Sequence, residues 1–150
     1  MISLEEIEQI KKHLGVKSLS FFFNDLPKSY PSMPMSSLSH TKDFKALATS
    51  SERVGFDMED LSRVSPSIES RISQKEDGVY PLGFLWSAKE AAFKSTYGKN
   101  QVSSFNQIII KNWTPKTESI WLFSFEHENK TQKGVVLQKE NMIFAFCSCF

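Results

Sequence analysis

The last fifty residues of this chain consist of short strand-like segments, and this pattern constrains the fold more than any other feature. Trp121, Phe123 and Phe125 alternate with their neighbours, which is the two-residue period of a β-strand. Two apolar segments flank the polar residues 139–141, as in a β-hairpin. The strands predicted in this region span residues 102–111, 119–127, 134–138 and 142–148.

A long helix is predicted before these strands. It begins at Pro81 or Leu82 and runs to about Tyr97, where Gly98 provides a stop signal. Two further helices are predicted from their N-terminal capping signals, at residues 2–14 and 66–72.

The first half of the chain adds more strands and one long loop. The predicted strands span residues 19–23, 37–40, 45–50 and 53–59. Between the first two, residues 24–37 carry three prolines and are expected to form an irregular loop. We therefore expect a single domain over residues 1–150 of the α+β class, in which one antiparallel sheet packs on the long helix.

Charge and apolar content argue against two classes of partner. The formal net charge is only +1, so the whole molecule has no charge excess that would attract nucleic acid. No apolar run approaches the roughly 20 residues that span a bilayer, so we expect no membrane segment. The acidic, amphipathic start is unlike a signal peptide. Cys147 and Cys149, the only cysteines, are expected to be buried thiols of a cytoplasmic protein.

Two acidic side chains are predicted to share one face of a strand. Residues two apart point the same way on a strand, so Asp57 and Glu59 would lie together while their apolar neighbours face the core. Two carboxylates placed in this way can share one divalent cation. The alternative is an edge strand whose acidic side chains face solvent.

A second cluster of charged residues lies on the long helix. Glu90 and Lys94 are four residues apart and therefore share a helical face. With Lys89, they would add a third carboxylate and two ammonium groups suited to phosphate. The alternative is a surface ion pair that stabilises the helix by roughly 0.3–0.5 kcal/mol.

A third polar cluster, Ser39-His40-Thr41, ends a short apolar segment. An imidazole and two hydroxyl groups can donate hydrogen bonds to phosphate. The alternative is a histidine that is structural or exposed to solvent at the end of a strand.

Taken together and in this order, the three clusters resemble the 4′-phosphopantetheinyl transferase superfamily, which includes the holo-acyl-carrier-protein synthases. The family pattern is an acidic Gly-x-Asp-x-Glu strand followed by a Trp/Phe-x-x-Lys-Glu-x-x-x-Lys helix. This chain has Gly-Phe-Asp-Met-Glu at 55–59 and Trp-Ser-Ala-Lys-Glu-Ala-Ala-Phe-Lys at 86–94. The larger members also carry a Ser-His-Ser/Thr element, which residues 39–41 match.

The resemblance implies a metal-dependent reaction. Members of the family move 4′-phosphopantetheine from coenzyme A, their substrate, to a serine of a carrier protein and release 3′,5′-ADP. Asp57, Glu59 and Glu90 would bind Mg²⁺, or Mn²⁺ in its place. Lys94 would contact phosphate oxygens during the transfer. Glu90, or a water on the metal, would take the proton of the serine.

The resemblance also implies contacts to coenzyme A. His40 would contact its phosphate groups, with Ser39 beside it. Lys89 and Lys94 would contact phosphate oxygens from the helix. These assignments, with the fold of the family, are expectations that follow from the motifs alone.

The expected partner is an acyl or peptidyl carrier protein, and the pathway stays open. Because carrier proteins are usually acidic, a basic surface should meet them, with candidates Arg63, Arg71, Lys89, Lys94 and Lys99. The chain has the motif order of the two-lobed family members in a length near that of the small trimeric ones. A single lobe would lack half of the site, so we expect a homo-oligomer, with a trimer as the expected form.

Two other functions stay open at this point. The chain would be a non-catalytic oligomeric relative if it binds coenzyme A or a carrier protein without transfer. It would be a Mg²⁺-dependent phosphohydrolase if water takes the place of the serine.

Overall fold

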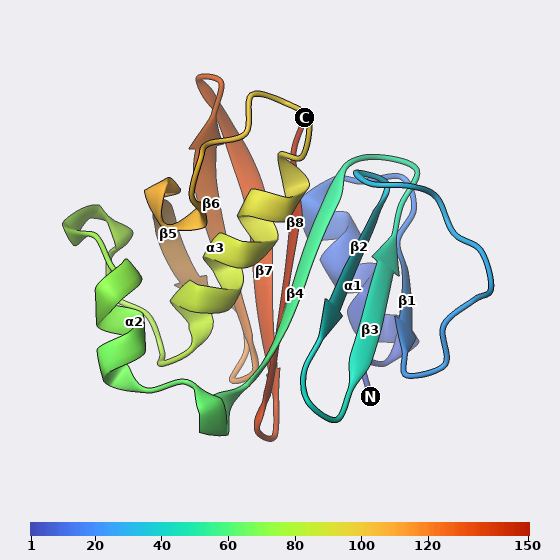
Figure 1. Cartoon of the computed structure of the whole chain (residues 1–150), viewed down its shortest axis with the longest axis horizontal. Coiled ribbons are helices and arrows are strands. Elements are labelled where there is room, and N and C mark those ends of the chain that lie inside the picture. Colours follow the sequence, from blue (N-terminus) through green and yellow to red (C-terminus); the bar gives the residue numbers. More distant parts are fainter.

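The computed structural model describes all 150 residues, and its eight strands form two antiparallel sheets (Figure 1). The three-stranded sheet has the order β1-β3-β2, and the five-stranded sheet has the order β4-β8-β7-β6-β5. The strands are β1 (Ser20–Phe23), β2 (Ser36–His40), β3 (Lys45–Thr49), β4 (Val54–Asp60), β5 (Ile110–Pro115), β6 (Ile120–His127), β7 (Lys130–Lys139) and β8 (Met142–Ser148). The expected single sheet packed on a long helix is therefore wrong.

Three α-helices and three short 3₁₀ helices complete the fold. The α-helices are α1 (Leu4–Leu14), α2 (Pro66–Ile72) and α3 (Phe84–Ser95), and the 3₁₀ helices are η1 (Leu61–Arg63), η2 (Lys75–Asp77) and η3 (Phe105–Gln107). None of them is long and apolar enough to cross a membrane. The predicted long helix is shorter at both ends, because Gly83 has a positive φ of 87° and Thr96 already leaves the helical region.

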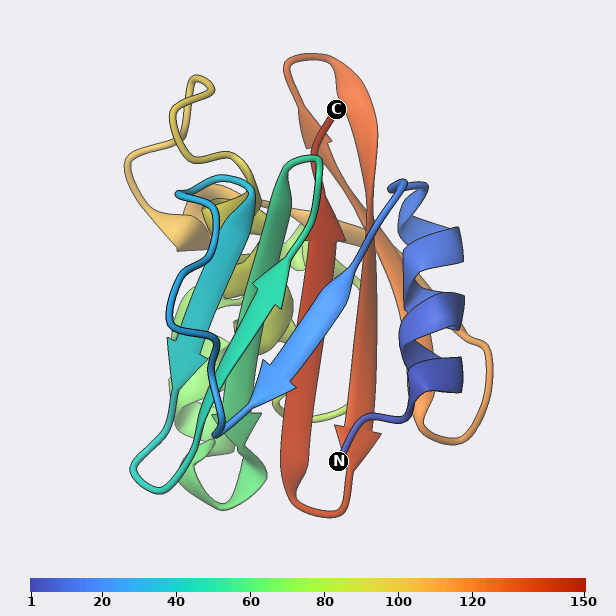
Figure 2. The same ribbon diagram turned by 90° about the vertical axis from the view of Figure 1, so that its right-hand side faces the viewer.

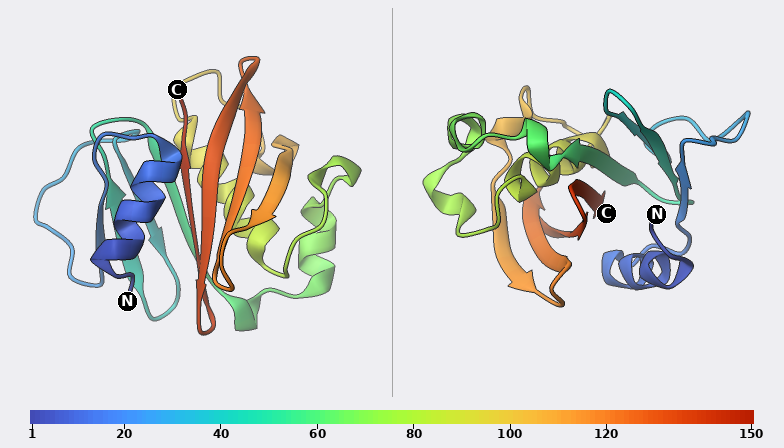
Figure 3. Two further views of the ribbon diagram at one scale, coloured as in Figure 1. Left: turned by 180° about the vertical axis from the view of Figure 1, so that it is seen from behind. Right: turned by 90° about the horizontal axis from the view of Figure 1, so that it is seen from below.

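The five-stranded sheet has a helix on each face (Figures 1 and 3). Each face of the sheet contributes to a separate apolar core. α3 covers one face of this sheet, and α1 covers the other face together with the three-stranded sheet. The interior strand β8, between β4 and β7, contributes side chains to both cores. Phe144 and Phe146 pack on the α1 side, and Ile143 and Ala145 pack on the α3 side. An unbroken apolar run is the pattern expected of a strand buried on both faces.

Serine hydroxyl groups keep the two sheets separate where β2 meets β4. The Oγ atoms of Ser37 and Ser39 accept hydrogen bonds from the backbone N–H groups of Phe56 (2.8 Å) and Met58 (3.0 Å). A third N–H group of β4, that of Val54, donates to a loop carbonyl oxygen at 3.0 Å. These bonds satisfy the edge of β4, so β2 packs beside it without extending the sheet. The alternation of side chains predicts a strand but not its partner, and for this reason the single-sheet prediction failed.

The proline-rich segment lies on the outer side of the three-stranded sheet (Figure 2). It is irregular, as predicted, but β2 begins at Ser36, one residue before the predicted end of the loop at residue 37. Most of the segment is exposed, including Tyr30 and Met33.

Some local predictions are confirmed and others are wrong. Ser3 and Glu6 form the capping box of α1, and a turn at residues 140–141 joins β7 to β8. The predicted strand at 102–111 is wrong, because this stretch contains η3 and β5 begins only at Ile110. Ile108 enters the core from the loop before β5, and Ile110 enters it from the first position of β5. The apolar pattern alone cannot distinguish such a loop from a strand. Both cysteines are free and buried, as expected.

Candidate functional site

The backbone of α3 touches β4 at a glycine. A methyl group on Gly55 would stand 1.8 Å from the carbonyl oxygen of Ala91 and 2.5 Å from the backbone nitrogen of Ser95. Only a residue without a side chain permits this approach. The glycine that begins the acidic motif therefore allows the polar face of α3 to lie against the acidic face of β4.

The three predicted carboxylates lie on these facing surfaces. Asp57 is only 4% exposed, and Glu59 and Glu90 are half-buried. As predicted, Phe56 and Met58 point to the other side of β4 and enter the core beneath α1. The alternative of a strand with solvent-exposed acids does not hold for Asp57.

Burial raises the pKa of all three carboxyl groups. The pKa of Asp57 rises to about 7, mainly because the group is buried, and the neighbouring Glu59 contributes to the rise. Burial also raises the pKa of Glu59, with a contribution from the charge of Glu90. Burial and the charge of Asp57 raise the pKa of Glu90. Neighbouring acidic groups that disfavour one another's ionisation are stabilised by binding protons or a cation. Clusters of this kind are typical of functional sites.

Lys94 crosses the junction of the two sheets. Its Nζ donates to the carbonyl oxygens of Leu38 on β2 (3.2 Å) and Phe56 on β4 (2.9 Å), and it pairs with Oδ1 of Asp57 at 3.3 Å. The side chain of Lys94 therefore ties α3 to both sheets and offsets part of the cost of burying Asp57. It remains 28% exposed, so a ligand can still reach it.

The hydroxyl group of Ser39 is occupied by protein contacts. It accepts the N–H group of Met58 and donates to Oδ1 of Asp57 at 3.4 Å, so it orients the carboxylate. The other oxygen of this carboxylate, Oδ2, is buried and accepts no hydrogen bond from a donor group, and the Glu59 carboxyl group lies close enough to share a proton with Asp57. A buried oxygen without a partner is costly, and a cation would satisfy it.

His40 stands beside the site but does not face it. It follows Ser39 on β2, so its side chain lies on the opposite face of the strand, where it is exposed. A surface hollow of about 400 Å³ is lined by His40, Thr41, Lys42 and Lys45, among others. The imidazole, hydroxyl and ammonium groups of this hollow suit a ligand that carries phosphate.

Lys89 lies outside the site. Its side chain is fully buried, and its Nζ pairs with Oδ2 of Asp77 at 3.1 Å and donates to the carbonyl oxygen of Asn106 at 3.1 Å. A lysine in this position reaches neither a phosphate nor a docked protein. The phosphate contact and the docking role expected of Lys89 therefore do not fit the structure. Lys89 is not part of the candidate site.

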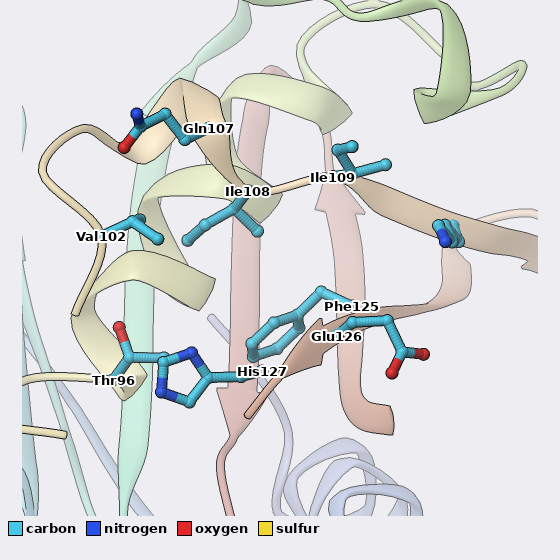
Figure 4. Close-up of a pocket in the computed structure, with 9 residues that line it drawn as sticks. Thr96, Val102, Gln107, Ile108, Ile109, Phe125, Glu126 and His127 are labelled. Atoms are coloured by element: carbon cyan, nitrogen blue, oxygen red, sulfur yellow. The ribbon is translucent and has the colours of Figure 1, made fainter. Parts of the chain in front are cut away.

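A separate cavity of about 170 Å³ lies between the end of α3, the loop that follows and β6 (Figure 4). Its lining includes Thr96, Ile108, Phe125 and His127 and none of the predicted site residues. The Nε2 atom of its histidine already contacts the carbonyl oxygen of Lys99. This cavity is therefore not part of the candidate site.

The carboxylates fit a hard divalent cation by their chemistry. No three His, Cys, Asp or Glu side chains are gathered closely enough to hold a metal ion as they stand. Asp57, Glu59 and Glu90 nevertheless offer oxygen donors, mutual repulsion and one orphaned buried oxygen, which a cation such as Mg²⁺ would relieve together. Their side chains would have to turn toward a common point to bind it.

Comparison of the sequence with models of protein families gave no match, and comparison with curated proteins gave none either. The resemblance to the transferase superfamily rests on the three motifs, and membership of the family stays a hypothesis.

Two residues that were not assigned to the predicted site contact it or its helix. The side chain of Trp86 lies close to Glu59 and opposes the rise of its pKa. Glu69 of α2 accepts the backbone N–H groups of Gly83 and Trp86 at the start of α3. The sequence did not predict this second contact, because the predicted helix began at Pro81 or Leu82 and only the structure shows that Gly83 is the N-cap.

Proposed function

We propose that this protein transfers the 4′-phosphopantetheine group of coenzyme A to a serine of an acyl or peptidyl carrier protein, in a reaction that depends on Mg²⁺. The observation that carries the proposal is the meeting of Asp57, Glu59, Glu90 and Lys94 on the facing surfaces of β4 and α3. These residues come from two motifs about thirty residues apart, which the resemblance assigns to one task.

The proposed site divides the work among these side chains. Asp57, Glu59 and Glu90 would hold Mg²⁺, or Mn²⁺, through their oxygen atoms. The bound cation would neutralise charge on the pyrophosphate of coenzyme A. Lys94 would add a positive charge from the opposite side of the carboxylate of Asp57, held in place by its two carbonyl contacts.

The transfer itself is a displacement at phosphorus. The hydroxyl oxygen of the carrier serine forms a bond to the phosphorus that bears pantetheine. The bond from this phosphorus to the bridging oxygen breaks, and 3′,5′-ADP leaves with the electron pair. Glu90 is the proposed acceptor of the serine proton, as the resemblance implies. As a ligand of Mg²⁺ it would be held ionised, which suits metal binding and weakens it as a base. A water molecule is the alternative acceptor.

The other predicted contacts enter the proposal in revised form. His40 and the lysines of its hollow are the proposed contacts for the phosphate groups of coenzyme A. Ser39 instead orients Asp57. For the carrier protein, the exposed Arg63 and Arg71 remain candidates for a docking surface.

Self-association, with a trimer as the expected form, stays a prediction, as does a cytoplasmic location. β4 and α3, which carry the carboxylates, meet within one chain, so the proposed carboxylate site needs no second copy. Sedimentation velocity measures the oligomeric state directly, and a monomer that retains activity would refute the expected trimer.

Release of 3′,5′-ADP tests the proposed reaction against both alternatives. Coenzyme A and Mg²⁺ are incubated with the protein, with and without an apo carrier protein. We expect release only when carrier and metal are both present, loss of release in Glu90→Gln, and normal release in Glu76→Gln, which changes an exposed acid. Release without a carrier would indicate a hydrolase. Binding of coenzyme A without release would indicate a non-catalytic relative.

A further inference from the structure

The helix that carries Glu90 begins without a capping side chain of its own. The N-cap of α3 is Gly83, which has a positive φ and no side chain to accept a hydrogen bond. A Cβ atom on Gly83 would lie 2.5 Å from Cδ1 of Ile143 and 3.1 Å from Cδ1 of Leu61, so a capping serine or aspartate does not fit there. The free N–H groups of the first turn must therefore find an acceptor on another element.

Glu69 of α2 is that acceptor. Its Oε1 and Oε2 atoms accept the N–H group of Gly83 at 3.1 and 2.9 Å, and Oε2 also accepts the N–H group of Trp86 at 3.4 Å. The residue is 4% exposed and forms no salt bridge with a basic side chain. A carboxylate at a helix N-terminus is also favoured by the helix dipole. All hydrogen-bond partners of this buried acid thus belong to the start of α3.

The turn held in this way leads into the candidate site. Trp86, Glu90 and Lys94 follow one another at intervals of four residues and form a stripe along one face of α3. The side chain of Trp86 lies close to Glu59, and Lys94 pairs with Asp57 at 3.3 Å. The position of α3 along its axis therefore decides where this stripe meets the carboxylates of β4.

A second buried acid from the same stretch of chain holds another face of α3. Asp77 and Lys89 pair at 3.1 Å with both side chains fully buried. Asp77 also accepts the N–H group of Ile110 at 2.9 Å, which joins α3 to the start of β5. The segment between β4 and α3 thus contacts the helix through two buried acidic side chains.

We propose that Glu69 is a positioning residue for the candidate site: it holds the first turn of α3 so that Glu90 meets Asp57 and Glu59. The kinetic consequence of this inference rests on the proposed function. Its consequence for cation binding can be measured without catalysis.

The test compares Glu69→Gln with two control variants. Gln keeps the length of the side chain but places an N–H₂ group against backbone N–H groups of α3. Ile10→Val removes a methylene from the core beneath α1, on the other face of the sheet. Glu76→Gln changes an exposed acid near Glu69. Binding of Mg²⁺ alone is measured by calorimetry, and kcat and KM for coenzyme A are measured well below the melting temperature of each variant.

We expect Glu69→Gln to weaken Mg²⁺ binding about tenfold and to lower kcat about tenfold, the size of effect usual for residues that orient metal ligands. The KM for coenzyme A should change by less than about twofold, because the lost interaction does not contact coenzyme A. Glu69→Asp, which keeps the charge on a shorter side chain, should fall between Gln and wild type. Ile10→Val should lower the melting temperature and leave both Mg²⁺ binding and kcat unchanged.

The outcomes separate the two proposals. An active wild type whose Glu69→Gln variant binds Mg²⁺ and turns over normally would overturn the positioning role and leave the transferase intact. Weakened Mg²⁺ binding in Glu69→Gln, in a protein that modifies no carrier, would support the positioning role and overturn the transferase. Equal losses in Ile10→Val, or no Mg²⁺ binding by the wild type, would overturn the positioning role.

Discussion

Replacing Asp57 with asparagine should stabilise this protein at alkaline pH while it removes the proposed activity. Asparagine has the same shape, and its Oδ1 atom can still accept hydrogen bonds from Ser39 and Lys94. Its Nδ2 atom would replace Oδ2, which has no hydrogen-bond partner. The substitution therefore removes a buried charge and keeps the contacts around it.

The size of the effect follows from the pKa of Asp57. This pKa is about 7 in the folded protein, against an ordinary value of 3.8. Between these values the folded state binds more protons than the unfolded state, so the free energy of unfolding falls as pH rises. At about 1.36 kcal/mol per pH unit, the whole interval corresponds to about 4 kcal/mol. About 2–3 kcal/mol of this loss should fall between about pH 5 and pH 8.

Urea unfolding of the wild type, Asp57→Asn and Glu118→Gln over about pH 5 to 8, without added metal, measures this loss. Relative to the wild type, Asp57→Asn should gain about 2–3 kcal/mol across the range. Glu118→Gln, which changes an exposed acid, should follow the wild type. Added Mg²⁺ should stabilise the wild type at alkaline pH and leave Asp57→Asn unaffected. A difference between Asp57→Asn and wild type that does not change with pH would refute the reasoning, because Asp57 would then titrate normally.

Three further substitutions test separate contacts. Gly55→Ala should destabilise the fold by about 3 kcal/mol or more, because its methyl group would meet the α3 backbone; wild-type stability in urea would contradict this close contact. Glu90→Gln should lower the rate of carrier modification at least about a hundredfold with little loss of stability, and a rate near that of the wild type would exclude Glu90 as ligand or base. Lys94→Met should raise the pKa of Asp57 further, since the Lys94 charge now lowers it; a carboxyl titration by NMR that shows no rise would argue against this ion pair.

Local signals in the sequence predicted elements well but not their assembly. The capping box at Ser3 and the serine before Pro66 both mark real helix starts. The division into two sheets could not be predicted, because it depends on which groups satisfy the edge of β4. Ser37 and Ser39 do so through their side chains, and the alternation of a strand is the same whether its neighbour bonds by backbone or by hydroxyl.

The candidate site was predicted where periodicity decides the direction of a side chain. Two-residue spacing correctly placed Asp57 and Glu59 on one face, and four-residue spacing correctly placed Glu90 with Lys94. The position of Lys89 could not be predicted, because the acid that buries it lies twelve residues earlier and meets it only in the folded chain. Contacts of this kind have no local signature.

The intact mass of an apo acyl carrier protein, after incubation with this protein, coenzyme A and Mg²⁺, tests the proposed function most directly. The proposed function predicts that the carrier gains the mass of one phosphopantetheine group. This gain should be absent when a chelator is added and absent with the Asp57→Ala variant. An unchanged mass across acyl and peptidyl carrier proteins, from a folded protein that binds coenzyme A, would contradict the transferase.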